Sequence, residues 1–214
     1  MKKIVIATTN KNKVERIKKM FKKDKIEFLS LNDVKIDGLG EPQETQNTPV
    51  GIAIEKAKYY VDALPEGYIV LTQDDTIAFE GVSEEDNPGV HIKKPVVDKY
   101  GEFTDENAAN YYTELADKYG GSIPMTFNYG HAIAIKDNSE REFVKIIGSA
   151  SKLEVRLVNR INKLESVPGY FLAAIMEAKV DGKWIPYNDL DKDTLVELDF
   201  DLYNSISKLI ESID

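Results

Sequence analysis

The chain has 214 residues, of which 42% are hydrophobic and 30% charged, so it is long enough to bury one large core. Its net charge of -9 and pI of about 4.9 disfavour nonspecific binding to nucleic acid or anionic membranes, whose phosphates would be repelled. The lack of cysteine excludes disulfides and thiol nucleophiles. No apolar run is long enough for a signal peptide or membrane span, so a soluble, cytoplasmic protein is expected.

The first third of the chain predicts a β-α-β unit followed by a second helix. Residues 3–8 form an apolar strand, and Asn10 is placed to cap the helix that follows. A short strand is expected at 26–31, and the polar segment 33–48 is expected to be a loop. Residues 49–64 carry apolar side chains at helical spacing, with a proline in the first turn.

The middle of the chain predicts two separate strands and one helix. The first strand covers 68–71, and a further strand follows through 77–82, with two aspartates between them. Residues 83–103 contain several prolines and glycines and are expected to be mostly loop. A helix is expected from Thr104 to about Tyr119, where two glycines end it.

The last part of the chain predicts further strands and a closing helix. Strands are expected at 125–135, 142–147, 153–157 and 170–176, and a helix at 202–213. No repeat or break in composition divides the sequence. The pattern therefore favours one α/β unit with an antiparallel excursion in its second half.

The turn between the first strand and the first helix is the first candidate site. Backbone N–H groups at a helix N-terminus attract anions, and Thr8 and Asn10 can add side-chain donors. Lys13 lies one turn into the helix, on a side that can reach a phosphate. The alternative is that Asn10 only caps the helix and Lys13 is solvated.

The second helix contains another lysine that can serve a ligand. Lys56 lies within the stripe formed by Ala53, Ala57 and Tyr60. A lysine in that position either extends along the apolar surface to reach solvent or points into a cleft beside the sheet.

Asp74-Asp75-Thr76 is the strongest candidate. The two carboxylates directly follow the apolar run 69–71, at the carboxyl end of the first expected strand, where open α/β sheets bind ligands. Carboxylates beside a buried run need a cation as a partner. Mg²⁺ typically takes one or two carboxylates plus phosphate oxygens, which this pair offers. The alternative is an exposed turn between two strands.

Other charged residues are weaker candidates. Asp37, Glu41 and Glu44 in the polar loop are further possible metal ligands, although most charged loop residues are simply solvated. The two histidines, His91 and His131, have no histidine or cysteine neighbours at metal-ligand spacing and are expected to be non-catalytic. The alternative for His91, which follows a Pro-Gly turn, is that it lines a pocket.

Taken in order, these motifs resemble the inosine triphosphate, or non-canonical purine NTP, pyrophosphatase family. The Thr-x-Asn-x-x-Lys turn of that family resembles residues 8–13, and its Ala-x-x-Lys-Ala helix resembles residues 53–57. Its Asp/Glu-Asp-Ser/Thr motif resembles residues 74–76. Pro88-Gly89-Val90 and Thr104-Asp105 are similar to the loop and helix start that follow. The resemblance extends over residues 1–150.

The resemblance implies an elongated mixed sheet with flanking helices, in which residues 1–214 form a single domain with two lobes around a central cleft, and a homodimer. It implies Mg²⁺-dependent hydrolysis of a nucleoside triphosphate to a nucleoside monophosphate and pyrophosphate. Asp74, Asp75 and Lys13 would be catalytic, and Asp75, Asp37 and Glu41 would hold the metal. The residues expected to bind substrate are Thr8, Thr9, Asn10, Lys56, Thr76 and Tyr170.

The last third of the sequence departs from the family pattern. The family has a Gly-Tyr-Asp-Pro segment that contacts the base or ribose, whereas this chain has Gly169-Tyr170-Phe171-Leu172. A Ser-His-Arg motif that recognises the base has no counterpart before the last helix. Two alternatives follow: a pyrophosphatase for a different modified nucleotide, or a nucleotide-binding protein that has lost catalysis.

Overall fold

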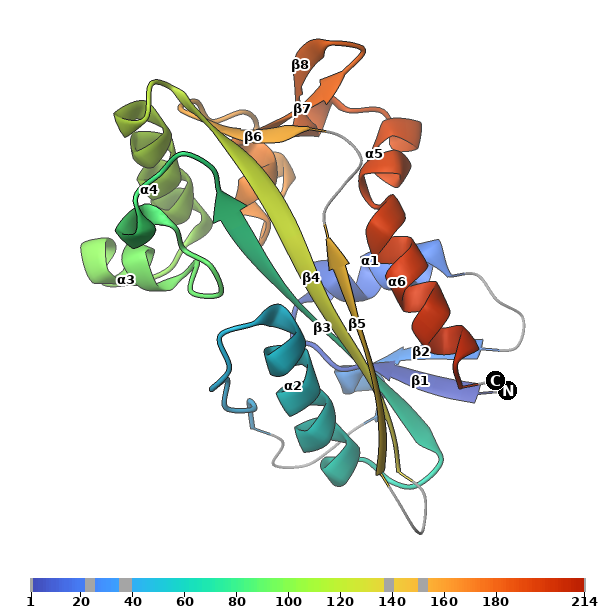
Figure 1. The fold of residues 1–214 in the computed structure, drawn as a ribbon. Coiled ribbons are helices and arrows are strands. Elements are labelled where there is room, and N and C mark those ends of the chain that lie inside the picture. The colour runs from blue at the N-terminus through green and yellow to red at the C-terminus, as the bar shows by residue number, and fades with distance from the viewer. Residues whose placement is uncertain (1, 22–25, 35–39, 137–140, 150–153, 214) are drawn as a thin grey trace. The chain divides into compact units, whose positions relative to one another are not determined.

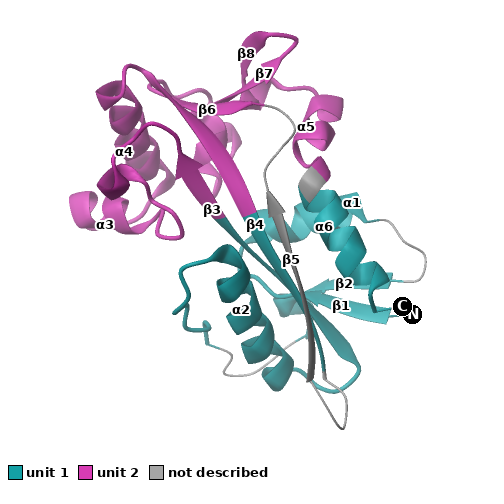
Figure 2. Cartoon of the chain, in the orientation of Figure 1, with its two compact units in different colours: residues 1–75, 129–148, 202–214 teal, residues 76–128, 149–201 magenta. Residues whose placement is uncertain are grey.

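The computed structural model describes residues 2–21, 26–34, 40–136, 141–149 and 154–213. The chain forms two compact units, which Figure 2 shows in teal and magenta. Unit 1 comprises residues 1–75, 129–148 and 202–214, and unit 2 comprises residues 76–128 and 149–201. Two long strands, β3 (Tyr68–Phe79) and β4 (Ser122–Lys136), contribute to both units.

Unit 1 contains the N-terminal β-α-β segment that the sequence predicts. Its described elements besides β3 and β4 are β1 (Lys2–Ile6), α1 (Lys11–Met20), β2 (Ile26–Ser30), the 3-10 turn η1 (Leu31–Val34), α2 (Pro49–Ala63), β5 (Arg141–Ser149) and α6 (Phe200–Glu211), the last two reaching one or two residues into unit 2. Each of these helices and strands falls within a few residues of its expected position.

Unit 2 contains shorter elements. They are η2 (Glu84–Asp86), α3 (Lys94–Tyr100), α4 (Asp105–Lys118), β6 (Val155–Val158), η3 (Leu164–Ser166), η4 (Phe171–Ala174), β7 (Met176–Val180), β8 (Lys183–Pro186), η5 (Tyr187–Asp189) and α5 (Lys192–Leu198). Across the described part of the chain, no helix combines the length and the apolar character needed to cross a bilayer.

The strands form a mixed sheet, as the fold class predicted. Their order is β2-β1-β3-β4-β6-β7-β8, with β5 paired to β4. The pairs on either side of β1 are parallel, and Ile4 lies opposite Phe28 in β2 and Ile69 in β3. β6, β7 and β8 pair antiparallel with their neighbours, which is the antiparallel excursion expected from the sequence.

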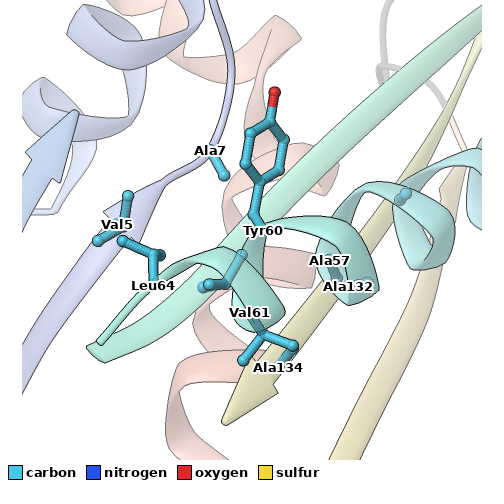
Figure 3. Packing of buried hydrophobic residues seen from close by; sticks show 10 residues of the cluster. Val5, Ala7, Ala57, Tyr60, Val61, Leu64, Ala132 and Ala134 are labelled. Atoms are coloured by element: carbon cyan, nitrogen blue, oxygen red, sulfur yellow. The ribbon is translucent and has the colours of Figure 1, made fainter. Parts of the chain in front are cut away.

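The core of unit 1 lies between α2 and one face of the strands (Figure 3). Successive side chains of a strand point to opposite faces, so every second residue of β1, β3 and β4 packs against α2. The strand residues of this cluster are Val5, Ala7, Val70, Ala132 and Ala134, and the helix residues are Ala53, Ala57, Tyr60, Val61 and Leu64. The alternate strand residues, Ile4, Ile6 and Leu71, are equally buried and point to the other face, which α1 and α6 cover (Figure 1).

The N-terminal turn of α2 is held very close to β4. A Cβ atom on Gly130 would lie 2.1 Å from the carbonyl carbon of Pro49 and 2.3 Å from the nitrogen of Val50. Only glycine permits this approach. Further along the sheet, the Thr72 hydroxyl donates to the carbonyl of Ala53 in α2 at 2.7 Å. The position of α2 is therefore fixed by backbone contact as well as by its apolar face.

The prediction of two strands, at 68–71 and 77–82, is wrong in one respect. They are parts of a single strand, β3, which continues through the two aspartates. Sequence pattern suggested a break because charged residues interrupt the apolar run. The carboxylates remain in the strand because lysines from two helices neutralise them, so Asp74 and Asp75 lie within β3 and not in a turn at its end.

Two further expectations need correction. The segment 83–103 contains the helix α3, and residues 171–174 form a 3-10 turn where a strand from 170 was expected. β8 and α5 were not anticipated. These elements are four to seven residues long, which is shorter than the window of about 11–18 residues over which apolar periodicity distinguishes a helix from other structure. The turn expected at 137–139 lies outside the described residues.

We expect Gly130→Ala to destabilise the protein by about 3 kcal/mol, because the methyl group has no space and α2 must shift. Gly67→Ala is the control. Gly67 has a φ of +87° but nothing within 4 Å of an added Cβ, so only backbone strain of about 1 kcal/mol is expected. Urea unfolding of both variants measures the difference, and equal losses would contradict the close approach of α2 to β4.

Candidate functional site: two lysine–carboxylate pairs in unit 1

The turn before α1 is organised by its own side chains. The Asn10 carboxamide oxygen accepts hydrogen bonds from the backbone N–H groups of Asn12, at 2.9 Å, and Lys13, at 3.3 Å. The Thr8 hydroxyl oxygen accepts from the N–H of Asn10 at 3.2 Å. Asn10 therefore caps the helix, as expected. Thr9 is exposed beside them, and phosphate binding by Thr8, Thr9 and Asn10 stays a prediction.

The first lysine–carboxylate pair joins α1 to β3. The Lys13 ammonium donates to the Asp75 carboxylate, and the Lys13 and Asp75 side chains are 21% and 35% exposed. Lys13 is thus not the freely solvated side chain of the alternative interpretation. The sequence separates these residues by 62 positions, and the fold brings them together because β1, which leads into α1, is paired with β3.

The second pair joins α2 to the preceding residue of β3. The Lys56 ammonium lies 2.6 Å from Asp74 Oδ1 and 2.7 Å from Glu44 Oε1. Both Lys56 and Asp74 are largely buried, with 17% and 13% of their side chains exposed. Lys56 therefore points toward the sheet and a second acid. Of the two orientations considered for this side chain, the structure shows the one that points inward beside the sheet, and not the one that extends to solvent.

Strand geometry explains why adjacent aspartates have different partners. Neighbouring residues in β3 point to opposite faces, so Asp74 faces α2 and Asp75 faces α1. The two pairs are still close enough to influence each other, because Lys13 acts on the charge of Asp74 and Lys56 acts on that of Asp75. Unit 1 therefore holds one coupled cluster of charges around the middle of β3.

Burial and charge shift the pKa values within the second pair. Burial raises the pKa of Asp74 above its usual value, and the opposing attraction of Lys56 does not cancel this effect. For Lys56, burial lowers the pKa, but Asp74 and Glu44 outweigh it, and the pKa ends above that of an ordinary lysine. Lys56 is therefore a firmly protonated cation beside a desolvated carboxylate.

Asp75 shows the opposite shift. Burial alone raises the pKa of Asp75, but the Lys13 ammonium, assisted by Arg16, lowers it below the usual value. Asp75 is therefore held as an anion. Arg16 was missed in the sequence. It follows Lys13 by three positions in α1, a spacing that places both side chains on one face of a helix and could have drawn attention to it.

His131 in β4 lies close to this cluster and is completely buried. Neither ring nitrogen has a hydrogen-bond partner. Burial lowers the pKa of His131 to about 4, and the positive charges of Lys13 and Arg16 act in the same direction. The imidazole is therefore neutral near pH 7.

The remaining predicted site residues are less closely associated. Glu41 is exposed, and its charge contributes to the raised pKa of Tyr60. Asp37 lies outside the described residues. Thr76 is buried and directly follows Asp75 in β3. Glu44 is the loop acid that the structure brings to the lysine–carboxylate cluster.

Tyr170 belongs to unit 2, where the segment departs from the family pattern. The N–H of Gly169 donates to the Asp105 carboxylate at 2.6 Å, and the Tyr170 ring lies edge-on to Tyr187. Phe171 is buried and stacks on Tyr112 at 5.6 Å between ring centres. An apolar side chain packed inside unit 2 therefore stands where the family pattern has an aspartate.

The acids of unit 1 provide suitable ligands for Mg²⁺, but they supply only part of its coordination shell. Asp74, Asp75 and Glu44 offer only carboxylate oxygens, which hard cations prefer. Among the described residues, no group of three histidine or acidic side chains is arranged to hold a metal. Mg²⁺ commonly uses one or two carboxylates and completes its shell with substrate phosphates and water. The donor set fits such an ion when it arrives with a phosphorylated ligand.

A mixed sheet flanked by helices, with two lysine–carboxylate pairs in the middle of a central strand, defines an α/β protein with a cluster of charged side chains in its sheet. A model of the Ham1 family matches residues 4–147, which is more than half of the chain. The chain therefore belongs to the Ham1 family, which confirms the family resemblance of the motifs.

Solved structures agree with this assignment of the fold. A HAM1 protein from Coxiella burnetii is 17% identical, with a TM-score of 0.70 over 99% of this chain and 100% of that one. The Staphylococcus aureus Ham1 protein is 18% identical, with a TM-score of 0.65 over the whole of both chains. A nucleoside-triphosphatase / dITP/XTP pyrophosphatase from Mycobacterium abscessus is 17% identical, with a TM-score of 0.58 over 96% of each. No curated protein matches the sequence.

His131 makes the stability depend on pH in a defined window. Its folded pKa of about 4 lies below the unfolded value of about 6.5, so the native state binds fewer protons between them. Protonation of His131 therefore has no effect on the free energy of unfolding above about pH 6.5. As the pH decreases toward about 4, it lowers that free energy by up to about 3 kcal/mol. We expect His131→Phe to reduce this decrease in urea unfolding measured across the window. His91→Phe, at an exposed site, is the control and should leave it unchanged.

Proposed function

We propose that this protein hydrolyses a nucleoside triphosphate between its α- and β-phosphates and releases pyrophosphate. The observation that carries the proposal is the coupled pair of lysine–carboxylate contacts from α1 and α2 to adjacent residues of β3. Two protonated lysines and two carboxylates within one cluster supply both the cations that bind phosphate and the anions that bind a metal. Membership of the Ham1 family supports the same chemistry.

Lys13 and Lys56 are the proposed phosphate ligands. Each ammonium has three N–H donors and can contact a phosphate oxygen while keeping or releasing its carboxylate. Lys13 lies beside the N-terminus of α1, whose N–H groups and dipole favour an anion. Binding of a triphosphate there would let both lysines turn from the carboxylates toward the ligand.

Asp75 and Glu44 are the proposed holders of Mg²⁺. Asp75 has a lowered pKa and stays ionised, and Glu44 is the loop acid that reaches the cluster. Glu41 and Asp37 remain alternatives for the second ligand. Bound Mg²⁺ would neutralise part of the triphosphate charge and so favour attack by a nucleophile.

The proposed reaction is an in-line displacement by water. Asp74, the carboxylate not assigned to the metal, orients a water molecule and accepts its proton as the water oxygen attacks the α-phosphorus. The bond from the α-phosphorus to the bridging oxygen of the β-phosphate breaks, and pyrophosphate leaves. Lys13 and Lys56 stabilise the negative charge that develops on the phosphate oxygens. Because the water attacks the α-phosphorus, the second product is a nucleoside monophosphate.

The preferred base is a separate question. Non-canonical purine nucleotides are the first substrates to test, because the sequence motifs resemble those of enzymes that act on them. The burial of Phe171 where the family pattern has an aspartate favours a second candidate, a pyrophosphatase for a different modified nucleotide. A nucleotide-binding protein without turnover is the remaining alternative. A homodimer in the cytoplasm also stays a prediction from the sequence.

Pyrophosphate release from a panel of canonical, deaminated and modified nucleoside triphosphates with Mg²⁺ tests the chemistry. We expect one class of triphosphate to be preferred, and we expect Asp75→Asn to lower turnover by at least about a hundredfold, because it removes the anion beside Lys13. Asp98→Asn is the matched control. Asp98 also pairs with a lysine, but that pair is fully on the surface of unit 2, so turnover should not change. Near-normal turnover in Asp75→Asn would contradict the proposed mechanism.

The dependence of turnover on Mg²⁺ concentration identifies the second metal ligand. We expect Glu44→Gln to raise the half-maximal Mg²⁺ concentration by about tenfold, because a carboxylate ligand is lost. The effect of Glu41→Gln should be much smaller, since Glu41 is not joined to the cluster. Glu114→Gln, which alters a surface pair with Lys99, controls for the loss of one acid. A larger shift in Glu41→Gln than in Glu44→Gln would assign the ligand to Glu41 instead.

A further inference from the structure

The imidazole of His131 destabilises the fold at its present position. It is 0% exposed, and both of its nitrogens lack a hydrogen-bond partner. A buried polar group without a partner destabilises a fold by about 1–3 kcal/mol, and such groups are rare in native proteins. An apolar side chain of similar size would avoid this cost. A residue that breaks a packing rule is therefore expected to have a functional reason.

The strand places His131 on the side of the sheet that faces α1. Ala132 and Ala134 mark the face of β4 that packs against α2, because both belong to the cluster there. His131 alternates with them and so points to the opposite face, where its ring lies 6.2 Å from that of Tyr129. Asp75 points to the same face, toward Lys13.

The charges that act on His131 come from the proposed phosphate site. They are Lys13 and Arg16 of α1 and Asp75 of β3. The imidazole is thus near the Lys13–Asp75 pair, although the pair does not use it as a hydrogen-bond partner. A neutral imidazole has one nitrogen that accepts a hydrogen bond and one that donates. The ammonium of Lys13 has three donors, and Asp75 takes one of them.

We propose that His131 is a positioning residue for Lys13. Its unpaired ring nitrogen accepts a hydrogen bond from the Lys13 ammonium, directly or through one water, when Lys13 turns from Asp75 to a phosphate oxygen. This inference rests on the proposed function, since it concerns the same phosphate site. The hydrogen bond to His131 replaces the one that Lys13 gives up at Asp75, and it holds the ammonium in one direction against the phosphate oxygen. A lysine held in this way contacts the phosphate in the productive geometry more often than one that is free to rotate.

A double-mutant cycle with Lys13 separates this role from simple packing. The probe is inorganic tripolyphosphate, whose affinity is measured by calorimetry with Mg²⁺ for the full chain. We expect His131→Phe to weaken binding by about tenfold in the wild-type background and by less than about twofold in Lys13→Met, because the lysine that it positions is gone. His131→Gln, which keeps a polar atom near the outer ring nitrogen, should recover part of the affinity.

Urea unfolding of each variant provides the stability control. We expect His131→Phe to unfold at an equal or higher urea concentration than the wild type, since it removes the unpaired group. If the larger ring does not fit, His131→Leu supplies the apolar variant with less volume. Equal losses of affinity in the wild-type and Lys13→Met backgrounds would show that His131 acts only through packing, and would overturn the proposal.

Turnover distinguishes failure of this inference from failure of the proposed function. Pyrophosphate release with no coupling between His131 and Lys13 would overturn the positioning role and leave the reaction standing. Coupling in tripolyphosphate binding, with no release from any triphosphate of the panel, would support the positioning role and contradict the hydrolysis. A wild-type protein that does not bind tripolyphosphate would overturn both.

Discussion

The structure of unit 1 depends on the need to neutralise two carboxylates within a mostly buried strand. Asp74 and Asp75 interrupt the apolar sequence of β3, and uncompensated charges at that depth would destabilise the fold. Because the strand turns its side chains alternately to each face, each carboxylate pairs with a different lysine. A helix on each side must therefore provide a lysine, and the packing of α1 and α2 against the sheet sets where the two lysines lie.

Much of this arrangement could be predicted from the sequence because it is encoded locally. Apolar periodicity places β1, α1, β2 and α2 within a few residues, and the caps Asn10, Thr48 and Thr104 each accept a hydrogen bond from the helix that they begin. The ordered motifs predicted the family, which the family match confirms. The sequence also indicates Lys13, Lys56 and the two aspartates as site residues, because each motif is short and lies on one element.

What the sequence could not provide arises from contacts between distant segments. The continuity of β3 depends on charges supplied by two other elements, so the aspartates looked like the end of a strand. Arg16 and His131 become candidate site residues only because the fold brings them near Asp75, which lies about sixty positions from each along the chain. In unit 2, the burial of Phe171 depends on Tyr112 and Phe103, and the pattern around it therefore suggested a strand where the chain makes a 3-10 turn.

The alternation along β3 also constrains how such a gene can change in length. Deleting one residue between Tyr68 and Gln73 would bring Thr76 to the position that faces α1, and inserting one would bring Gln73 to the position that faces α2. Either event leaves one lysine without its carboxylate, although every residue of the motif is still present in the translated sequence. Among related chains, gaps should therefore be confined to the connections between elements, and an alignment that opens one inside this strand would be suspect.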